Sequence, residues 1–124
     1  MINSRAVFIL SDQQNDPLIS DLIVKGYFPI IYGDMQHGLR LLRHGKFLAV
    51  LILRDQNNVD SLEFALNLRD FNKTVPILLI GDPNPKEDKL ITRLSNTLTL
   101  RKDTGEEKKK LFKILYEYLT NHQS

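Results

Sequence analysis

Five short apolar segments recur along the chain, and each is followed by residues whose apolar positions have helical spacing. Four of the segments are almost continuously apolar, which is typical of strands buried on both faces of a sheet. The last segment alternates apolar and polar residues, which also predicts a strand. Pro29 in the second segment favours an edge strand or the start of a strand, because proline has no N–H to donate. The five predicted strands are residues 6–10, 28–32, 47–53, 75–80 and 97–100.

Capping residues mark where the predicted helices begin. Asp16 precedes Pro17, which is the favoured order of an N-cap and a first helical residue. Asp60 and Thr104 each have a glutamate three residues later, which is the spacing of a capping box. The predicted helices begin at residues 17, 35, 61, 85 and 105, and the second ends at residue 44, the fourth at about 95 and the last at about 120.

The order of these elements is β-α repeated five times, over one domain that spans residues 1–124. Strands separated by helices predict a parallel sheet with right-handed crossovers and helices on both faces. In such α/β sheets, ligands and catalytic groups gather at the carboxyl ends of the strands. The residues that follow each predicted strand are therefore the candidates for function.

Composition narrows the class of protein. The chain has 124 residues, 42% of them hydrophobic and 26% charged, which suits one soluble domain. It has no cysteine, which excludes disulfides and thiolate chemistry. Its net charge of +2 is too balanced to predict a nucleic-acid surface, and the Lys108–Lys110 run is interpreted as a solvated helix end. No apolar run approaches the ~18 residues of a membrane span, so we expect a cytoplasmic protein that does not contact the membrane.

Two further kinds of site are disfavoured. His37, His44 and His122 lack the spacing of a metal pair, so we predict surface histidines and no metal site of their own. Residues 11–15 contain no glycine, which argues against a phosphate-binding loop for a dinucleotide or flavin cofactor.

Polar residues do follow the predicted strands. Acidic side chains opposite a basic one can hold a hard cation or a phosphoryl group. The same residues can equally well cap helices and face water, and the pattern alone leaves both interpretations open. The residues are Ser11 and Asp12 after the first strand, Arg54 and Asp55 after the third, Gly81 and Asp82 after the fourth, and Arg101 and Lys102 after the fifth.

At this point the chain resembles the receiver domains of two-component signalling. The resemblance depends on the β-α order, on the phrase Asp60-Ser61-Leu62-Glu63 that opens the third helix, and on Val75-Pro76-Ile77 at the fourth strand. It implies the flavodoxin-like, CheY-like fold, a three-layer sandwich whose five parallel strands have the order 2-1-3-4-5.

The resemblance also implies where the family's phosphorylation residues would fall. The two acidic residues that hold magnesium correspond to Ser11 and Asp12, so one acid is missing. The phosphate-accepting aspartate falls at Leu53, which cannot attack a phosphoryl group. The small hydroxyl residue falls at Gly81, and the lysine falls at Arg101, which keeps the charge but not the shape. The resemblance thus implies a vestigial pocket with no catalytic residue and no cofactor.

Asp55 supports a competing interpretation. It lies two residues beyond Leu53, so it would point to the same face of an extended strand. A shorter loop before Asp60 would place Asp55 in the acceptor position. The chain would then be an ordinary phosphoaccepting response regulator of a phosphorelay, with Mg²⁺ held by Asp12 and Asp55. A third possibility is a binding module for an unrelated ligand on the same fold.

Residues 76–85 resemble one branch of the family, the atypical N-terminal receiver-like domains of flagellar master regulators of the NtrC class. That resemblance implies transcription regulation through dimer formation or through restraint of an ATPase domain. The predicted domain takes up residues 1–124, so an ATPase or DNA-binding segment would lie outside them. We therefore expect either a stand-alone protein or one domain of a longer one.

The last predicted helix carries a broad apolar stripe. Phe112 and Tyr116 are four residues apart and lie to one side of it. They either rest on the flank of the core or form a partner surface, where aromatic residues are enriched. In receivers the face made by helix 4, strand 5 and helix 5 is the usual site of dimer or partner contact, so the resemblance favours a protein partner or a homodimer there. The core-facing residues of the stripe are predicted to be Leu111, Ile114, Leu115 and Tyr118.

Overall fold

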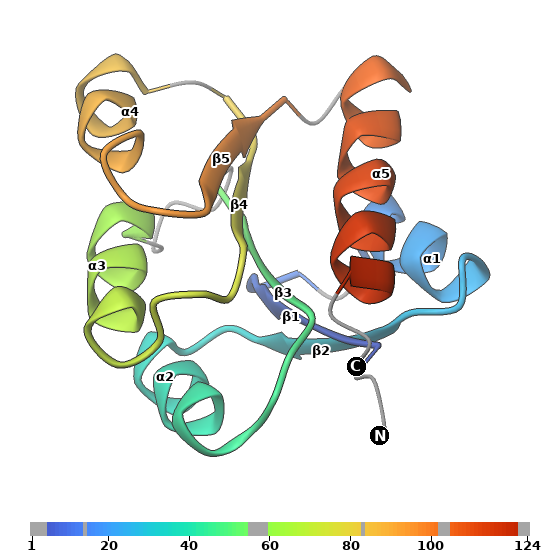
Figure 1. The fold of residues 1–124 in the computed structure, drawn as a ribbon, viewed down its shortest axis with the longest axis horizontal. Coiled ribbons are helices and arrows are strands. Elements are labelled where there is room, and N and C mark those ends of the chain that lie inside the picture. Colours follow the sequence, from blue (N-terminus) through green and yellow to red (C-terminus); the bar gives the residue numbers. More distant parts are fainter. Residues whose placement is uncertain (1–4, 14, 55–59, 83, 102–104, 122–124) are drawn as a thin grey trace.

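The structure is a computed structural model, and it describes residues 5–13, 15–54, 60–82, 84–101 and 105–121 (Figure 1). Strands and helices alternate along the whole chain, as the sequence predicts. The strands are β1 (Ala6–Leu10), β2 (Phe28–Tyr32), β3 (Ala49–Leu53), β4 (Ile77–Ile80) and β5 (Thr97–Leu100). The helices are α1 (Pro17–Val24), α2 (Met35–His44), α3 (Ser61–Phe71), α4 (Pro85–Ile91) and α5 (Gly105–Asn121).

All the strand pairs are parallel, and the sheet has the order β2-β1-β3-β4-β5. This confirms the predicted fold class and strand order. β2 is an edge strand, which is one of the two positions that Pro29 favoured. Two strands are shorter than predicted, because β3 begins at Ala49 and β4 begins at Ile77, directly after Pro76. α4 is also shorter, because after Ile91 the chain tightens into turns in which N–H groups bond to carbonyls three residues earlier.

Helices cover both faces of the sheet (Figure 1). α1 and α5 bury one face, and α2, α3 and α4 bury the other. Side chains alternate between these two cores along β3, so Leu51 and Leu53 point toward α1 and α5, whereas Ile52 points toward the other layer. By the same alternation, Arg54 leaves the end of β3 on the side of α3 and α4.

The helix starts are fixed by side-chain caps, which lie at the carboxyl end of the sheet. Asp16, Asp34, Asp60 and Asn84 each accept a hydrogen bond from a main-chain N–H of the following first turn. The caps predicted at Asp16 and Asp60 are thereby confirmed. The predicted cap Thr104 lies outside the described residues.

Arg69 organises the opposite, amino end of the sheet. Its buried guanidinium donates to four main-chain carbonyl oxygens, at 2.7–3.1 Å. Two acceptors belong to the connection between α3 and β4, and two belong to the connection between α4 and β5. One side chain thus joins the loops that lead into two neighbouring strands. The acceptors are the oxygens of Asn72, Val75, Ser95 and Asn96.

Candidate functional site

The sheet brings the residues of the predicted pocket to one edge. Leu53 lies beside Ile80 in the strand register. Beyond the strands, the Arg54 N–H donates to the Ile80 oxygen at 2.8 Å, and the Gly81 N–H donates to the Leu100 oxygen at 3.0 Å. The ladder therefore carries the residues after β3, β4 and β5 to the same carboxyl edge, as the sequence predicts.

Leu53 occupies the place where the resemblance put the phosphate acceptor. Its side chain is fully buried, at 0% exposure, in the core that faces α1 and α5. Ile80, Leu100 and Leu111 belong to the same core cluster. An ionised group at this depth would lose its hydration without an opposite charge to replace it. The tip of the central strand is therefore a packed apolar position.

The residues after β1 supply one exposed acid. Ser11 is buried, and its hydroxyl is occupied locally, because it accepts from the Gln13 N–H at 3.0 Å and donates to the Gln13 oxygen at 3.2 Å. Asp12 is exposed, and its Oδ1 lies 2.9 Å from the position that a Cβ on Gly33 would occupy. Glycine at residue 33 thus leaves room for the Asp12 carboxylate. Within the described part of the chain, no group of three or more acidic, histidine or cysteine side chains is placed to hold a metal ion.

The residues after β4 and β5 depart from the family pattern in different ways. Gly81 is buried and has a φ of 141°, in a region that favours glycine. A serine or threonine at this position would strain the backbone. Arg101 is exposed beside the start of α5. Asp55, the alternative acceptor, and Lys102 both lie outside the described residues.

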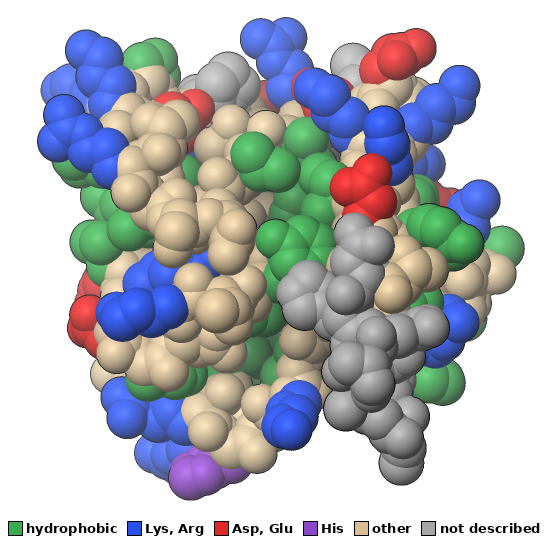
Figure 2. Space-filling view, in the orientation of Figure 1, with side chains coloured by type: hydrophobic (Ala, Val, Ile, Leu, Met, Phe, Trp, Pro, Cys, Tyr) green, Lys and Arg blue, Asp and Glu red, His purple; other side chains and the backbone are tan. Residues whose placement is uncertain are grey.

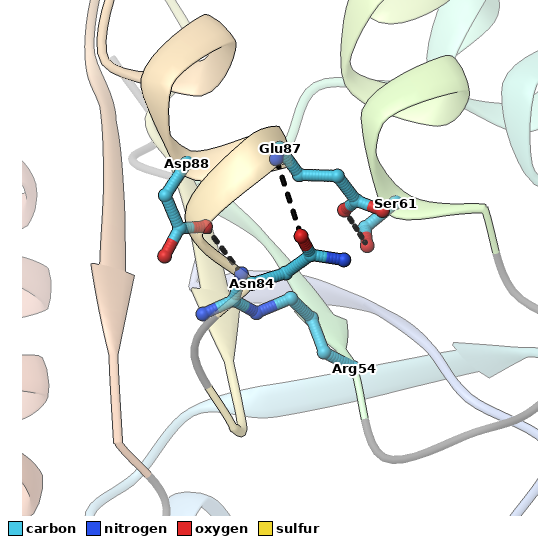
Figure 3. A network of polar contacts seen from close by, with 5 residues as sticks. All are labelled: Arg54, Ser61, Asn84, Glu87 and Asp88. Carbon is cyan, nitrogen blue, oxygen red and sulfur yellow. Dashed lines mark hydrogen bonds and ion pairs between the residues drawn. The ribbon is translucent and has the colours of Figure 1, made fainter.

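A buried ion pair occupies the α3–α4 side of the same edge (Figure 3). Arg54 Nη1 lies 2.6 Å from Asp88 Oδ1, and the two side chains are 5% and 23% exposed. Nearby, the Ser61 hydroxyl donates to Glu87 Oε1 at 3.3 Å. The network joins the end of β3 to the first turns of α3 and α4 (Figure 3).

Arg54 is incompletely satisfied in this network. Its Nε is buried and has no hydrogen-bond partner among the described residues. With one ion pair among the described residues, this almost fully desolvated charge gains less than it would in a complete set of hydrogen bonds. The sequence shows that Arg54 follows the strand, and alternation gives its side, but only the fold supplies Asp88, 34 residues away along the chain.

The aromatic pair on α5 is divided between two environments. Phe112 is partly buried and stacks on Tyr27, with ring centroids 6.3 Å apart and Lys25 Nζ 5.6 Å from the Phe112 centroid. Tyr116 is 62% exposed. Both residues lie on the flank of α5 that faces α1 and the start of β2.

The flank of α5 that faces β5 carries other residues. Ile114 and Tyr118 line a hollow there, together with Leu98 of β5. At 100° per residue this flank is on the other side of the core stripe from Phe112 and Tyr116. The assignment of the aromatic pair to the helix 4–strand 5–helix 5 face is therefore corrected, because helix rotation places Ile114 and Tyr118 on that face.

No helix among the described residues is both long and apolar enough to cross a bilayer. A scan of the sequence with models of protein families finds no match, and a search of curated proteins finds none either.

Solved structures do resemble this one. A CheY-like response regulator receiver domain protein from Methanospirillum hungatei superposes with a TM-score of 0.74 at 15% identity, covering 95% of this chain and 98% of that one. The chemotaxis protein CheY4 of Vibrio cholerae gives 0.74 at 19% identity, covering 94% and 99%. The receiver domain of a sensor histidine kinase from Pseudomonas aeruginosa, solved with a magnesium ion in its active site cleft, gives 0.68 at 16% identity, covering 94% and 98%. The chain therefore has the fold of CheY-like receiver domains.

Proposed function

We propose that this chain is an atypical receiver domain that regulates through protein–protein contact without aspartyl phosphorylation. The observation that carries the proposal is Leu53, which is fully buried among apolar side chains at the tip of the central strand. A leucine offers neither a nucleophile for phosphoryl transfer nor a ligand for a cation. The domain itself would then have no catalytic residue.

The residues around Leu53 also support the absence of phosphorylation. Mg²⁺ prefers several oxygen ligands in near-octahedral geometry. At this edge Asp12 is exposed, the Ser11 hydroxyl is bonded within its own loop, and Gly81 has no side chain. The described residues therefore do not fit a magnesium site of the receiver kind.

The ion pair between Arg54 and Asp88 suggests how such a domain works. It fixes the start of α4 to the end of β3 without any added phosphoryl group. α4 is short, and its fully buried side chain is Ile91. We propose that partner binding, rather than phosphorylation, shifts α4 between a docked and a free state, an equilibrium of a few kcal/mol.

The surface proposed for partner contact is the α4–β5–α5 face. It exposes Leu98, at 50%, in the hollow that Ile114 and Tyr118 also line, and it exposes Leu90 of α4, at 48%. Figure 2 shows hydrophobic side chains gathered between β5 and α5 on this side of the molecule. Apolar centres of this kind are typical of interface cores. The partner is either a second copy of the chain or another protein.

The resemblance of residues 76–85 to flagellar regulators gives this contact a proposed output. In that case two copies of the chain would associate through this face, or the face would bind and restrain an ATPase or DNA-binding domain of the same regulatory system. Gel filtration of the chain mixed with such a domain would test this output, and elution of the two as separate species would count against it.

The proposal is tested by incubating the protein with a small-molecule phosphodonor and Mg²⁺ and measuring its intact mass. We expect no added phosphoryl group. A mass increase that disappears in Asp55→Asn would overturn the proposal in favour of a phosphoaccepting receiver. Asp82→Asn is the matched control, because Asp82 also follows a strand but lies after β4.

The contact surface is tested separately by light scattering. Leu98→Asp on the β5 flank should abolish self-association, or partner binding, because it places a charge in the proposed apolar centre. Tyr116→Asp is the control on the other flank and should leave association unchanged. The reverse pattern would move the contact surface to the α1 side of α5.

A further inference from the structure

A hollow opens on the side of the carboxyl edge that faces α1 and α5. It lies between the first turns of these two helices and the ends of β4 and β5, and its volume is about 130 Å³. Its apolar lining comes from Leu18, Ile80, Leu100 and Leu111. Ile80 is the register partner of Leu53, so the hollow adjoins the apolar tip of the central strand.

Four charged residues line the hollow: Arg101 is exposed, and the other three have partners within the protein. Asp16 is buried and accepts the Leu18 N–H at 2.9 Å as the cap of α1. Lys108 Nζ lies 2.8 Å from Asp21 Oδ2. Glu107 Oε2 lies 3.8 Å from Lys110 Nζ. These three side chains are engaged within the protein, so the hollow offers an entering ligand mainly hydrocarbon contact.

Size and lining together define a ligand class. An engineered apolar cavity of about 150 Å³ is known to accept benzene, a molecule of six carbon atoms. From the volume and the lining we propose that this hollow is a binding site for a compact, uncharged, apolar molecule of about that size. A charged ligand of the same size would lose more hydration on entering this mainly hydrocarbon lining than an uncharged one.

The position of the hollow would allow a bound ligand to regulate the proposed partner contact. This inference extends the proposed function, because occupancy would be sensed at the same edge where a receiver senses its phosphoryl group. A ligand there would press on Leu111 of α5 and on Ile80 and Leu100, at the ends of the two strands that border the partner face. Ligand binding depends only on the hollow, so its test is independent of whether the protein is phosphorylated.

The test uses three probes with the same ring but different charge: toluene, benzoate and benzylammonium. Methyl resonances of the whole protein are followed by NMR during titration with each probe. We expect saturable shifts with toluene at the methyl groups of Leu18, Ile80, Leu100 and Leu111, and affinities at least about tenfold weaker for both charged probes. Equal or tighter binding of a charged probe would overturn the inference, and so would the absence of saturable shifts with toluene.

A variant pair sharpens the result. Leu111→Phe fills the hollow and should weaken toluene binding at least about tenfold, whereas Ile114→Phe, on the other flank of the same helix, should leave it within about twofold. Unchanged binding in folded Leu111→Phe would overturn the inference. If Leu111→Phe does not fold, nuclear Overhauser contacts in the wild type decide, because contacts from toluene to Ile80 and Leu100 methyls support the site and contacts elsewhere refute it.

Discussion

Two buried arginines lie at opposite ends of the sheet, and they are satisfied to different degrees. At the amino end, Arg69 donates to four main-chain carbonyl oxygens. At the carboxyl end, Arg54 makes one ion pair with Asp88, and its buried Nε has no hydrogen-bond partner among the described residues. The two residues are the same chemical group in two different kinds of environment.

The difference separates the end of the molecule that Arg69 fixes from the end to which the proposed function assigns movement. Burial lowers the pKa of Arg69, but an arginine stays charged at neutral pH, and four carbonyl dipoles compensate that charge. The Arg69 clamp holds two loops in one arrangement. The Arg54 pair joins α4 to the end of β3 by one ion pair, so the proposed movement of α4 would break fewer polar contacts there than a movement of the loops held by Arg69. Incomplete satisfaction is thus concentrated where the proposed function requires movement.

The largest expected effect is at the amino end. Arg69→Met should lower the free energy of unfolding by about 4 kcal/mol, because it removes the donor of four carbonyl oxygens, one in a buried and three in partly buried hydrogen bonds. Urea denaturation measures the loss. Arg93→Met is the control, since Arg93 is exposed, and it should change stability by less than about 0.5 kcal/mol. A loss below about 1 kcal/mol for Arg69→Met would remove the distinction between the two ends.

Leu53→Ala is next in size. It removes a fully buried side chain from the tip of β3 and should lower the free energy of unfolding, measured by urea denaturation, by about 3 kcal/mol. The matched control is Leu98→Ala, because Leu98 is half exposed in β5 and should lose less than about 1 kcal/mol. Similar losses for the two variants would mean that the tip of the central strand is not tightly packed.

The ion pair at the carboxyl end should respond asymmetrically. Asp88→Ala leaves the more deeply buried Arg54 unpaired, and it should lower the free energy of unfolding by about 2 kcal/mol. The loss is smaller than for a fully buried pair because Asp88 is 23% exposed. Arg54→Met leaves the more exposed partner and should cost less. Hydrogen exchange should quicken in α4 in both variants while the amides of β4 stay protected. Equal losses with no local effect on α4 would contradict a docked helix.

The smallest effect concerns the pH dependence at the amino end, where Tyr27 precedes β2. Burial raises the pKa of Tyr27 in the folded protein. The unfolded chain therefore releases this proton first, so stability should fall as the pH rises above the unfolded value of about 10. Tyr27→Phe should flatten that alkaline decline, and Tyr116→Phe, at an exposed position, serves as the control. A decline that is unchanged in Tyr27→Phe would show that the ring is hydrated.

The sequence by itself determined the elements and their order. Apolar runs and helical spacing are repeated over a few neighbouring residues, so the parallel sheet and the caps Asp16 and Asp60 were predictable. The burial of Leu53 was also predictable, since Leu53 is the last residue of a continuous apolar run. The sequence contains only a weak indication that Arg69 is buried. Arg69 lies four residues after the core residue Ala65, which places both on the same buried face of α3.

The tertiary structure alone decided which distant groups meet. The acceptors of Arg69 lie in two separate loops, up to 27 residues along the chain from Arg69, and they are main-chain oxygens that any residue provides. Asp88 reaches Arg54 only because the crossover through α4 returns over the end of β3. Phe112 was placed toward α1 rather than β5 by the rotation of α5 on the sheet. Local patterns specify the period of an element, whereas its rotation and its distant partners are set by how all the elements pack together.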